Sequence, residues 1–161
     1  MENKLRIISN QYSILGKYLE IFVSGCNHNH GCSGTCFNRE SWDFSLGTEW
    51  ELLELKLTDK ILTNIDIIDL LIVTGGEPLD QDLTELLAFI KFLKTFKIPI
   101  CVFTSYKFKE VPESIKANVD YLKCNPFDVK QKKDKDVGLF VLASTNQVLY
   151  KKEPDGVWSC I

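Results

Sequence analysis

Apolar residues gather in short continuous runs along the chain, and segments with helical periodicity lie between them. We predict strands from the runs, which are rich in Ile, Val, Leu and aromatic residues. The predicted strands are Leu5–Ser9, Tyr18–Ser24, Leu70–Thr74, Ile100–Ser105, Val119–Lys123 and Leu139–Ala143. Several runs lack the alternation of apolar and polar residues that a half-exposed strand would show. This pattern is typical of parallel strands that are covered on both faces.

Helical periodicity is clearest over residues 83–96, where apolar side chains recur three and four positions apart. A second helix is predicted from about Thr58, a favourable N-cap residue, to Ile67. A shorter helix is predicted after Pro112. Strands that alternate with helices indicate right-handed crossovers and a parallel sheet. Because no repeat or linker interrupts the pattern, we predict one α/β domain over residues 1–161.

The composition of the 161 residues is that of a soluble globular protein, with 45% hydrophobic and 25% charged residues. A net charge of −3 gives no basic footprint for nucleic acid. Aspartates interrupt the basic segment KQKKDKD, where we expect a solvated loop. The N-terminus lacks the apolar core of an export signal, and no apolar run is long enough to span a membrane. We therefore expect a cytoplasmic protein with reduced thiols, which disfavours a disulfide.

Three cysteines with the spacing C-x5-C-x3-C follow the second predicted strand: Cys26, Cys32 and Cys36. In α/β folds, ligands bind at the carboxyl ends of the strands. Structural zinc needs four protein ligands, and His28 or His30 would have to supply the fourth. Three thiolates can instead hold a [4Fe–4S] cluster and leave one iron open. The residues alone leave both metals possible.

A second signal, IVTGGEP at residues 72–78, ends another predicted strand. Gly75 and Gly76 allow the backbone to approach a ligand closely, and Glu77 can accept hydrogen bonds from an ammonium group. A glycine turn followed by Pro78 at the start of a helix explains the same residues equally well. Because three cysteines lie at the same end of the sheet, we interpret the segment as a polar cradle for a small molecule.

Four separate segments occur along the chain in this order: FVSGCNHNHGCSGTCFNRESWDF, VTGGEPL, DYLKCNPF and STNQVLY. Together they resemble the radical SAM superfamily, and more narrowly the small activating proteins of anaerobic (class III) ribonucleotide reductase. The first is similar to the cluster loop of that family, and the second to its Gly-Gly-Asp/Glu-Pro motif. The usual cysteine spacing in the family is C-x3-C-x2-C, so both gaps in this chain are longer.

This resemblance implies a partial parallel β/α barrel and an enzyme that cleaves S-adenosylmethionine reductively. Cys26, Cys32 and Cys36 would ligate three irons of a [4Fe–4S] cluster, and the amino acid end of S-adenosylmethionine would bind the fourth. The resulting 5′-deoxyadenosyl radical would take a hydrogen atom from a glycine in the catalytic subunit of anaerobic ribonucleotide reductase. An electron donor such as flavodoxin or ferredoxin would reduce the cluster.

The resemblance also implies cofactor contacts around the cysteine loop. The implied cofactor-binding residues are Phe37, Asn38, Gly75, Gly76, Glu77, Pro78, Thr104 and Lys123. The glycine motif would bind the methionine amino group, and Phe37 would pack on the adenine, a role for which Thr35 competes. Asn38 would bind the cofactor or shape the turn after the loop. Thr104, Ser105 and Lys123 would bind the methionine carboxylate or pack at the rim.

The remaining cysteines have plainer interpretations. Cys101 lies inside an apolar run, and we expect a buried small hydrophobic residue. Cys124 follows a predicted strand and could face the rim, whereas Cys160 is expected to be a reduced bystander. Two other functions stay open. One is a radical SAM enzyme that acts on a small molecule, as in modified-purine synthesis, and the other is a non-catalytic zinc module.

Overall fold

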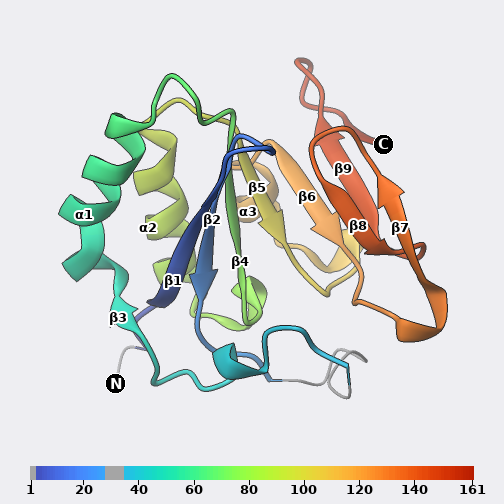
Figure 1. Ribbon diagram of the computed structural model, residues 1–161, viewed down its shortest axis with the longest axis horizontal. Helices are drawn as coiled ribbons and strands as arrows, with labels where there is room; N and C mark the ends of the chain where they lie inside the picture. Colours follow the sequence, from blue (N-terminus) through green and yellow to red (C-terminus); the bar gives the residue numbers. More distant parts are fainter. Residues whose placement is uncertain (1–2, 28–34) are drawn as a thin grey trace.

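The computed structural model describes residues 3–27 and 35–161. Cys32, His28 and His30 lie outside these residues, so the predictions made for them are not tested by the structure. An eight-stranded mixed sheet forms the centre of the fold (Figure 1), and a two-stranded sheet pairs β7 with β8.

The strands of the large sheet lie in the order β10-β9-β6-β5-β4-β2-β1-β3. In chain order, the strands are β1 (Arg6–Ser13), β2 (Tyr18–Val23), β3 (Thr48–Glu49), β4 (Leu70–Gly75), β5 (Ile100–Phe103), β6 (Tyr121–Cys124), β7 (Lys132–Asp136), β8 (Val141–Ser144), β9 (Val148–Lys152) and β10 (Trp158–Cys160). The helices are α1 (Trp50–Thr63), α2 (Leu83–Lys94) and α3 (Glu113–Lys116), with short 3-10 turns η1 (Arg39–Ser41), η2 (Pro78–Asp80), η3 (Phe108–Glu110) and η4 (Val129–Gln131).

The middle of the large sheet is parallel. β2 pairs with β4, β4 with β5 and β5 with β6, all in the same direction. α1, α2 and α3 each connect two of these neighbours. The register places Val23 beside Gly75, so β2 and β4 end together. The segments that follow the four parallel strands therefore meet at one rim of the sheet.

Both edges of the large sheet are antiparallel, and this arrangement contradicts the predicted fold class. β1 pairs antiparallel with β2 and β3 at one edge, and β9 with β6 and β10 at the other. The prediction of a partial parallel β/α barrel is therefore wrong, and the structure is a large mixed sheet with few helices. After Cys124 the chain has no further segment with helical periodicity. It returns in short strands joined by turns, a connection that gives antiparallel pairing.

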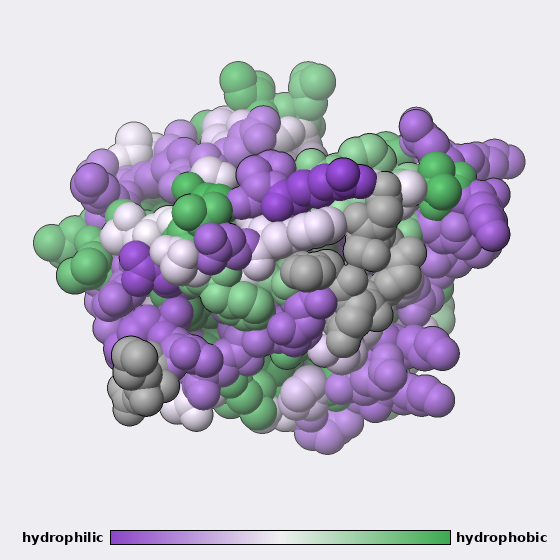
Figure 2. All heavy atoms as spheres, turned by 90° about the horizontal axis from the view of Figure 1, so that it is seen from below, coloured by the Kyte–Doolittle hydropathy of each residue, from purple (hydrophilic) through white to green (hydrophobic). Residues whose placement is uncertain are grey.

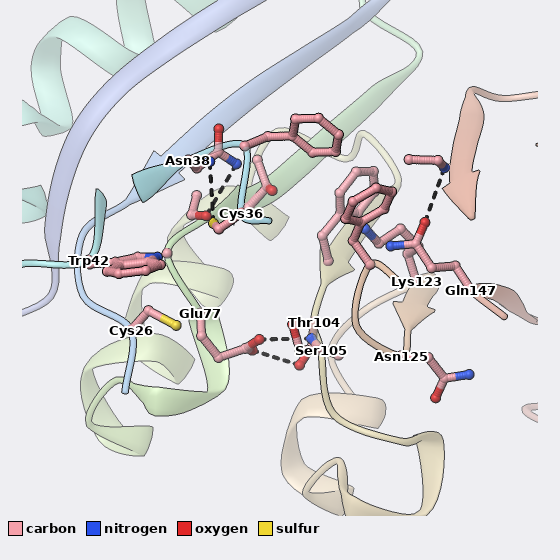
Figure 3. A pocket seen from close by; sticks show the side chains of 17 residues that line it. Cys26, Cys36, Asn38, Trp42, Glu77, Thr104, Ser105, Lys123, Asn125 and Gln147 are labelled. Atoms are coloured by element: carbon pink, nitrogen blue, oxygen red, sulfur yellow. Dashed lines mark hydrogen bonds between the residues drawn. The ribbon is translucent and has the colours of Figure 1, made fainter. Parts of the chain in front are cut away.

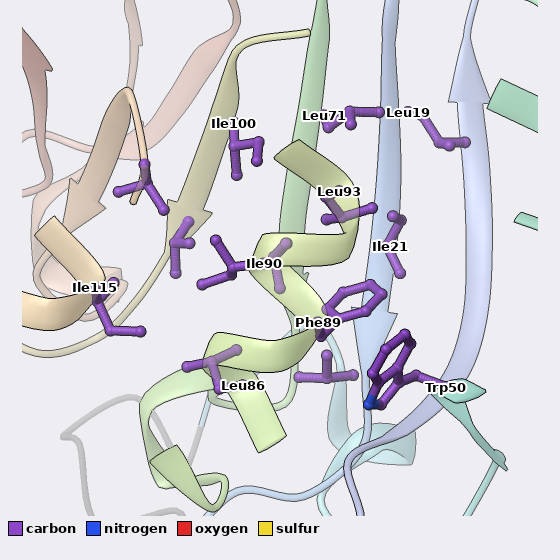
Figure 4. Packing of buried hydrophobic residues seen from close by; sticks show 14 of the residues in the cluster. Leu19, Ile21, Trp50, Leu71, Leu86, Phe89, Ile90, Leu93, Ile100 and Ile115 are labelled. Atoms are coloured by element: carbon purple, nitrogen blue, oxygen red, sulfur yellow. The ribbon is translucent and has the colours of Figure 1, made fainter. Parts of the chain in front are cut away.

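The three described α-helices pack on one face of the large sheet, as Figure 4 shows for part of the cluster. α2 places Leu86, Phe89, Ile90 and Leu93 against the strands, and all four are fully buried. Their spacing is the one from which the helix over residues 83–96 was predicted. That prediction is confirmed, with the helix ending at Lys94.

β7 and β8 cover the opposite face of the sheet. Val137 and Leu142 belong to a second buried cluster that includes Ile72 of β4. The strand predicted at Leu139–Ala143 is observed as β8, at Val141–Ser144, but it pairs with β7 in the small sheet. The chain therefore covers this face with a hairpin instead of adding another strand to the parallel centre.

α1 begins at Trp50 and not at about Thr58, so the predicted start of this helix is wrong. Leucines on several sides of the helix obscure its apolar stripe. Leu57 is buried, whereas Leu52 and Leu55 are 73% and 84% exposed. Sequence periodicity alone could not separate the buried leucines from the exposed ones.

Figure 2 shows the molecule from the side of the rim at which the parallel strands end. The described surface there is mostly hydrophilic and carries separate hydrophobic groups. Within residues 3–27 and 35–161, no helix is long and apolar enough to cross a membrane.

Candidate functional site

A cavity lies at the rim where the parallel strands end (Figure 3). Its volume is about 150 Å³, which is below the roughly 300–1,000 Å³ of typical small-molecule sites, and it is open to solvent. The predicted site residues that line it are Cys26, Cys36, Phe37, Asn38, Gly75, Gly76, Glu77, Thr104 and Lys123. Pro78 is buried at the start of η2 and, like Thr35, is not among the lining residues. Cys32 lies outside the described residues.

Cys26 is fixed where three segments meet. It follows β2 closely and is 8% exposed. Its backbone N–H donates to the carbonyl of Trp42 at 3.1 Å, and the Gly25 N–H donates to the carbonyl of Ser41 at 2.7 Å. The Gly25 carbonyl accepts the N–H of Glu77 at 2.9 Å. The position of Cys26 is therefore fixed jointly by the end of β2, the glycine motif and the chain after the cysteine loop.

Asp80 holds the residue that follows Cys26. Its Oδ2 accepts the backbone N–H of Asn27 at 2.8 Å, and its Oδ1 accepts the hydroxyl of Tyr106 at 2.7 Å. Burial and the hydrogen bond to Asp80 raise the pKa of Tyr106, so its hydroxyl is a donor at neutral pH. Sequence reasoning missed both residues. Neither belongs to the motifs, and they meet only because β4 and β5 lie side by side.

The sulfur of Cys36 accepts a backbone hydrogen bond. The N–H of Asn38 lies 3.3 Å from Sγ, and hydrogen bonds to sulfur are one determinant of iron–sulfur potentials. Asn38 also donates from Nδ2 to the carbonyl of Gly75 at 3.4 Å, and its carbonyl accepts the hydroxyl of Ser41 at 2.6 Å. Asn38 thus shapes the turn after the cysteine loop, one of its two predicted roles. Its contact with a cofactor stays a prediction.

The two glycines of the motif pack against the end of β2. Gly75 has a φ of +113°, which L side chains rarely adopt, and a Cβ there would lie 2.4 Å from the carbonyl oxygen of Val23. A Cβ at Gly76 would lie 2.3 Å from the carbonyl oxygen of Gly25. The absence of side chains at the two glycines therefore lets the motif pack directly against the protein's own backbone at Val23 and Gly25. This packing brings the motif against the first cysteine.

The carboxylate of Glu77 links the end of β4 to the segment after β5. The residue is 2% exposed, and its Oε1 accepts the N–H of Leu79 at 3.0 Å and the hydroxyl of Thr104 at 2.6 Å. Its Oε2 accepts the N–H of Ser105 at 2.8 Å. An ionised carboxylate has about four acceptor sites, so hydrogen bonds from within the protein occupy most of those of Glu77. The hydrogen bond from a ligand ammonium group to Glu77 stays a prediction. The observed contacts give Glu77 a second role, which is to position Thr104 and Ser105 at the cavity.

The far wall of the cavity, opposite Cys26, is aromatic and carries the ammonium group of Lys123. Phe37 packs against Phe127 with ring centroids 4.7 Å apart. The Nζ of Lys123 lies 4.5 Å from the centroid of the Phe103 ring. Gln147 joins this wall from the turn between β8 and β9. In the sequence, only the segment STNQVLY pointed to Gln147 and only the segment DYLKCNPF pointed to Phe127, and nothing pointed to Phe103.

The other described cysteines lie outside the cavity lining. Cys101 is fully buried, as predicted for a small hydrophobic residue, and burial raises the pKa of its thiol. Cys124 is fully buried in the core, and burial, followed by the nearby charge of Glu77, raises its pKa to about 12. Cys160 is exposed. Because the thiolate is the metal-binding form, the two buried thiols are poor candidates for ligands.

Cys26 and Cys36 fit the donor set of an iron–sulfur cluster. Thiolates are the ligands that hold such clusters, and these two line one cavity, one fixed by backbone contacts and the other receiving an N–H···S hydrogen bond. The third predicted ligand, Cys32, follows from the sequence alone.

Comparisons with known proteins agree with this chemistry. The chain is 28% identical over 141 residues to the anaerobic ribonucleoside-triphosphate reductase-activating protein of Haemophilus influenzae, a match that covers 84% of this chain and 88% of the relative. The predicted resemblance to activating proteins of glycyl-radical enzymes is confirmed. The model of a family described as "4Fe-4S single cluster domain" matches residues 15–150. The chain belongs to this 4Fe-4S single cluster domain family.

Proposed function

We propose that this protein activates anaerobic ribonucleotide reductase by cleaving S-adenosylmethionine reductively and generating a glycyl radical on the catalytic subunit. The observation that carries the proposal is the meeting of Cys26, Cys36 and the Gly75 and Gly76 motif at one cavity. The name of the Haemophilus influenzae relative supports activation of an anaerobic reductase as the role and the reductase as the partner. Residues 1–161 would form one activase domain that works in the cytoplasm with flavodoxin or ferredoxin as electron donor.

Cys26, Cys32 and Cys36 would hold a [4Fe–4S] cluster. When bound, such a cluster supplies an electron and one open iron for chelation of an amino acid. The chain positions the ligands through its own hydrogen bonds. The Trp42 carbonyl and the Asp80 carboxylate fix the backbone on the two sides of the Cys26 side chain. The N–H of Asn38 stabilises negative charge on the sulfur of Cys36.

The two ends of the cavity suit the two halves of S-adenosylmethionine. The amino acid half would lie beside the cysteines and the glycine motif, where Glu77 holds the hydroxyl of Thr104 and the backbone of Ser105 in place. The adenosyl half would extend toward the aromatic wall. Phe103 and Phe127 would exclude water from the reacting sulfonium bond.

Anaerobic reconstitution with iron and sulfide, followed by reduction in the presence of S-adenosylmethionine, tests the proposal. The wild-type protein should bind the cluster and form 5′-deoxyadenosine. Cys26→Ala, Cys32→Ala and Cys36→Ala should each lose both, because each removes one of three thiolates. Cys160→Ala is the matched control, since Cys160 is exposed and lies outside the cavity lining. A colourless zinc-loaded protein, or full cleavage in a loop variant, would contradict the proposal.

A further inference from the structure

Gln147 has a buried side chain at the far wall of the cavity. It lies in the turn between β8 and β9 and is 3% exposed. Figure 3 shows Gln147 across the cavity from Cys26 and Cys36. The cysteine-metal chemistry does not use it, and its burial requires an explanation because buried polar atoms normally have hydrogen-bond partners.

The orientation of the Gln147 amide is set by the backbone. Its Oε1 accepts the N–H of Ala143 at 3.1 Å and the N–H of Ser144 at 3.3 Å. The reverse orientation would place an NH₂ group against two N–H donors, which cannot bond to it. The NH₂ group therefore occupies the other position, and it has no hydrogen-bond partner among residues 3–27 and 35–161. In Figure 3 the amide nitrogen is on the cavity side of the group.

We propose that Gln147 is a specificity-determining residue that donates a hydrogen bond to a ring nitrogen of the adenine of S-adenosylmethionine. This inference rests on the proposed function. A cluster held by the cysteines would bind the amino acid half at the opposite end of the cavity, so the base would be the part of the ligand that reaches Gln147. The same wall includes the rings of Phe37, Phe103 and Phe127 and the ammonium of Lys123. Flat apolar walls with one fixed donor match a planar base that offers acceptor nitrogens.

Gln147→Glu separates binding from folding. A carboxylate keeps an oxygen toward the N–H groups of Ala143 and Ser144, but it replaces the donor in the cavity with an acceptor. We expect the melting temperature to stay near the wild-type value and the affinity for S-adenosylmethionine to fall roughly 10-fold or more, because donor and acceptor no longer match. L-Methionine, which lacks the base, should bind the two proteins equally. Equal affinity of both proteins for S-adenosylmethionine would overturn the inference.

A second measurement uses the wild-type fold only. S-Adenosylmethionine is compared with three analogues in which one adenine ring nitrogen, N1, N3 or N7, is replaced by C–H. One analogue should bind the wild type about 2- to 10-fold more weakly, and that difference should vanish in Gln147→Ala. Equal binding of all three would exclude the contact. If the wild type assembles its cluster but does not bind S-adenosylmethionine at all, the proposed function fails together with this inference.

Discussion

At the scale of single residues, two carboxylates just after β4 organise the rim through their neighbours. Glu77 accepts hydrogen bonds from the segment after β5, and Asp80 accepts one from the residue after Cys26 and one from Tyr106. Each carboxylate joins segments that lie far apart in the sequence. Their removal should therefore affect the geometry of the site more than the hydrophobic core.

Glu77→Gln should lower the free energy of unfolding of the apoprotein. The amide places its NH₂ group either at the oxygen that now accepts the Ser105 N–H or at the oxygen that now accepts the Leu79 N–H and the Thr104 hydroxyl. In each orientation a backbone N–H loses its acceptor. The expected loss is about 1–3 kcal/mol, measured by urea unfolding. The control is Glu54→Gln, an exposed position on α1, which should change the stability by less than about 0.5 kcal/mol. Equal stabilities of the two variants would show that the Glu77 hydrogen bonds do not hold the rim together.

Among the elements, the contact between η2 and the start of the cysteine loop should control how firmly the cluster is held. Asp80→Ala removes the acceptor for the Asn27 N–H and the Tyr106 hydroxyl. Groups that orient metal ligands typically change metal affinity by about 10- to 100-fold. We expect the reconstituted variant to lose iron to a chelator roughly 10-fold faster than the wild type, followed by absorbance.

Tyr106→Phe should have a smaller effect on the rate of iron loss. It removes one hydrogen bond and leaves the bond between Asp80 and Asn27 in place. Asp66→Ala, an exposed position after α1, serves as the control for a lost surface carboxylate. If Asp80→Ala and Asp66→Ala lose iron at the wild-type rate, the contact does not position the cysteine loop.

The elements also show which parts of the fold were predictable. Continuous apolar runs predicted β4 and β5 because strands buried on both faces need apolar residues at every position. α2 was predicted because its stripe is clean, whereas the exposed Leu52 and Leu55 hid the true start of α1. The antiparallel edges could not be predicted in the same way. The pairing of β1 with β3 and of β6 with β9 depends on contacts between distant segments, which no local pattern records.

For the molecule as a whole, the candidate site was predictable where its residues form motifs. The cysteine spacing and the glycine motif identified Cys26, Cys36, Gly75 and Gly76, which the fold brings to one cavity. Asp80 and Tyr106 escaped sequence reasoning, because their roles arise only when separate strand ends meet at the rim. For Gln147 the sequence offered only the segment STNQVLY, which did not indicate its place in the cavity. The barrel prediction is wrong because the resemblance rests on motifs at the site, which do not determine how the edge strands pair.

One measurement tests the central claim most directly. The reduced, reconstituted protein is mixed with S-adenosylmethionine and the catalytic subunit of an anaerobic ribonucleotide reductase, and the mixture is examined by electron paramagnetic resonance. We predict a glycyl radical doublet that requires all three components and disappears when the target glycine of the reductase is replaced by alanine. If 5′-deoxyadenosine forms together with a modified small molecule and the reductase acquires no radical, the protein is not its activase.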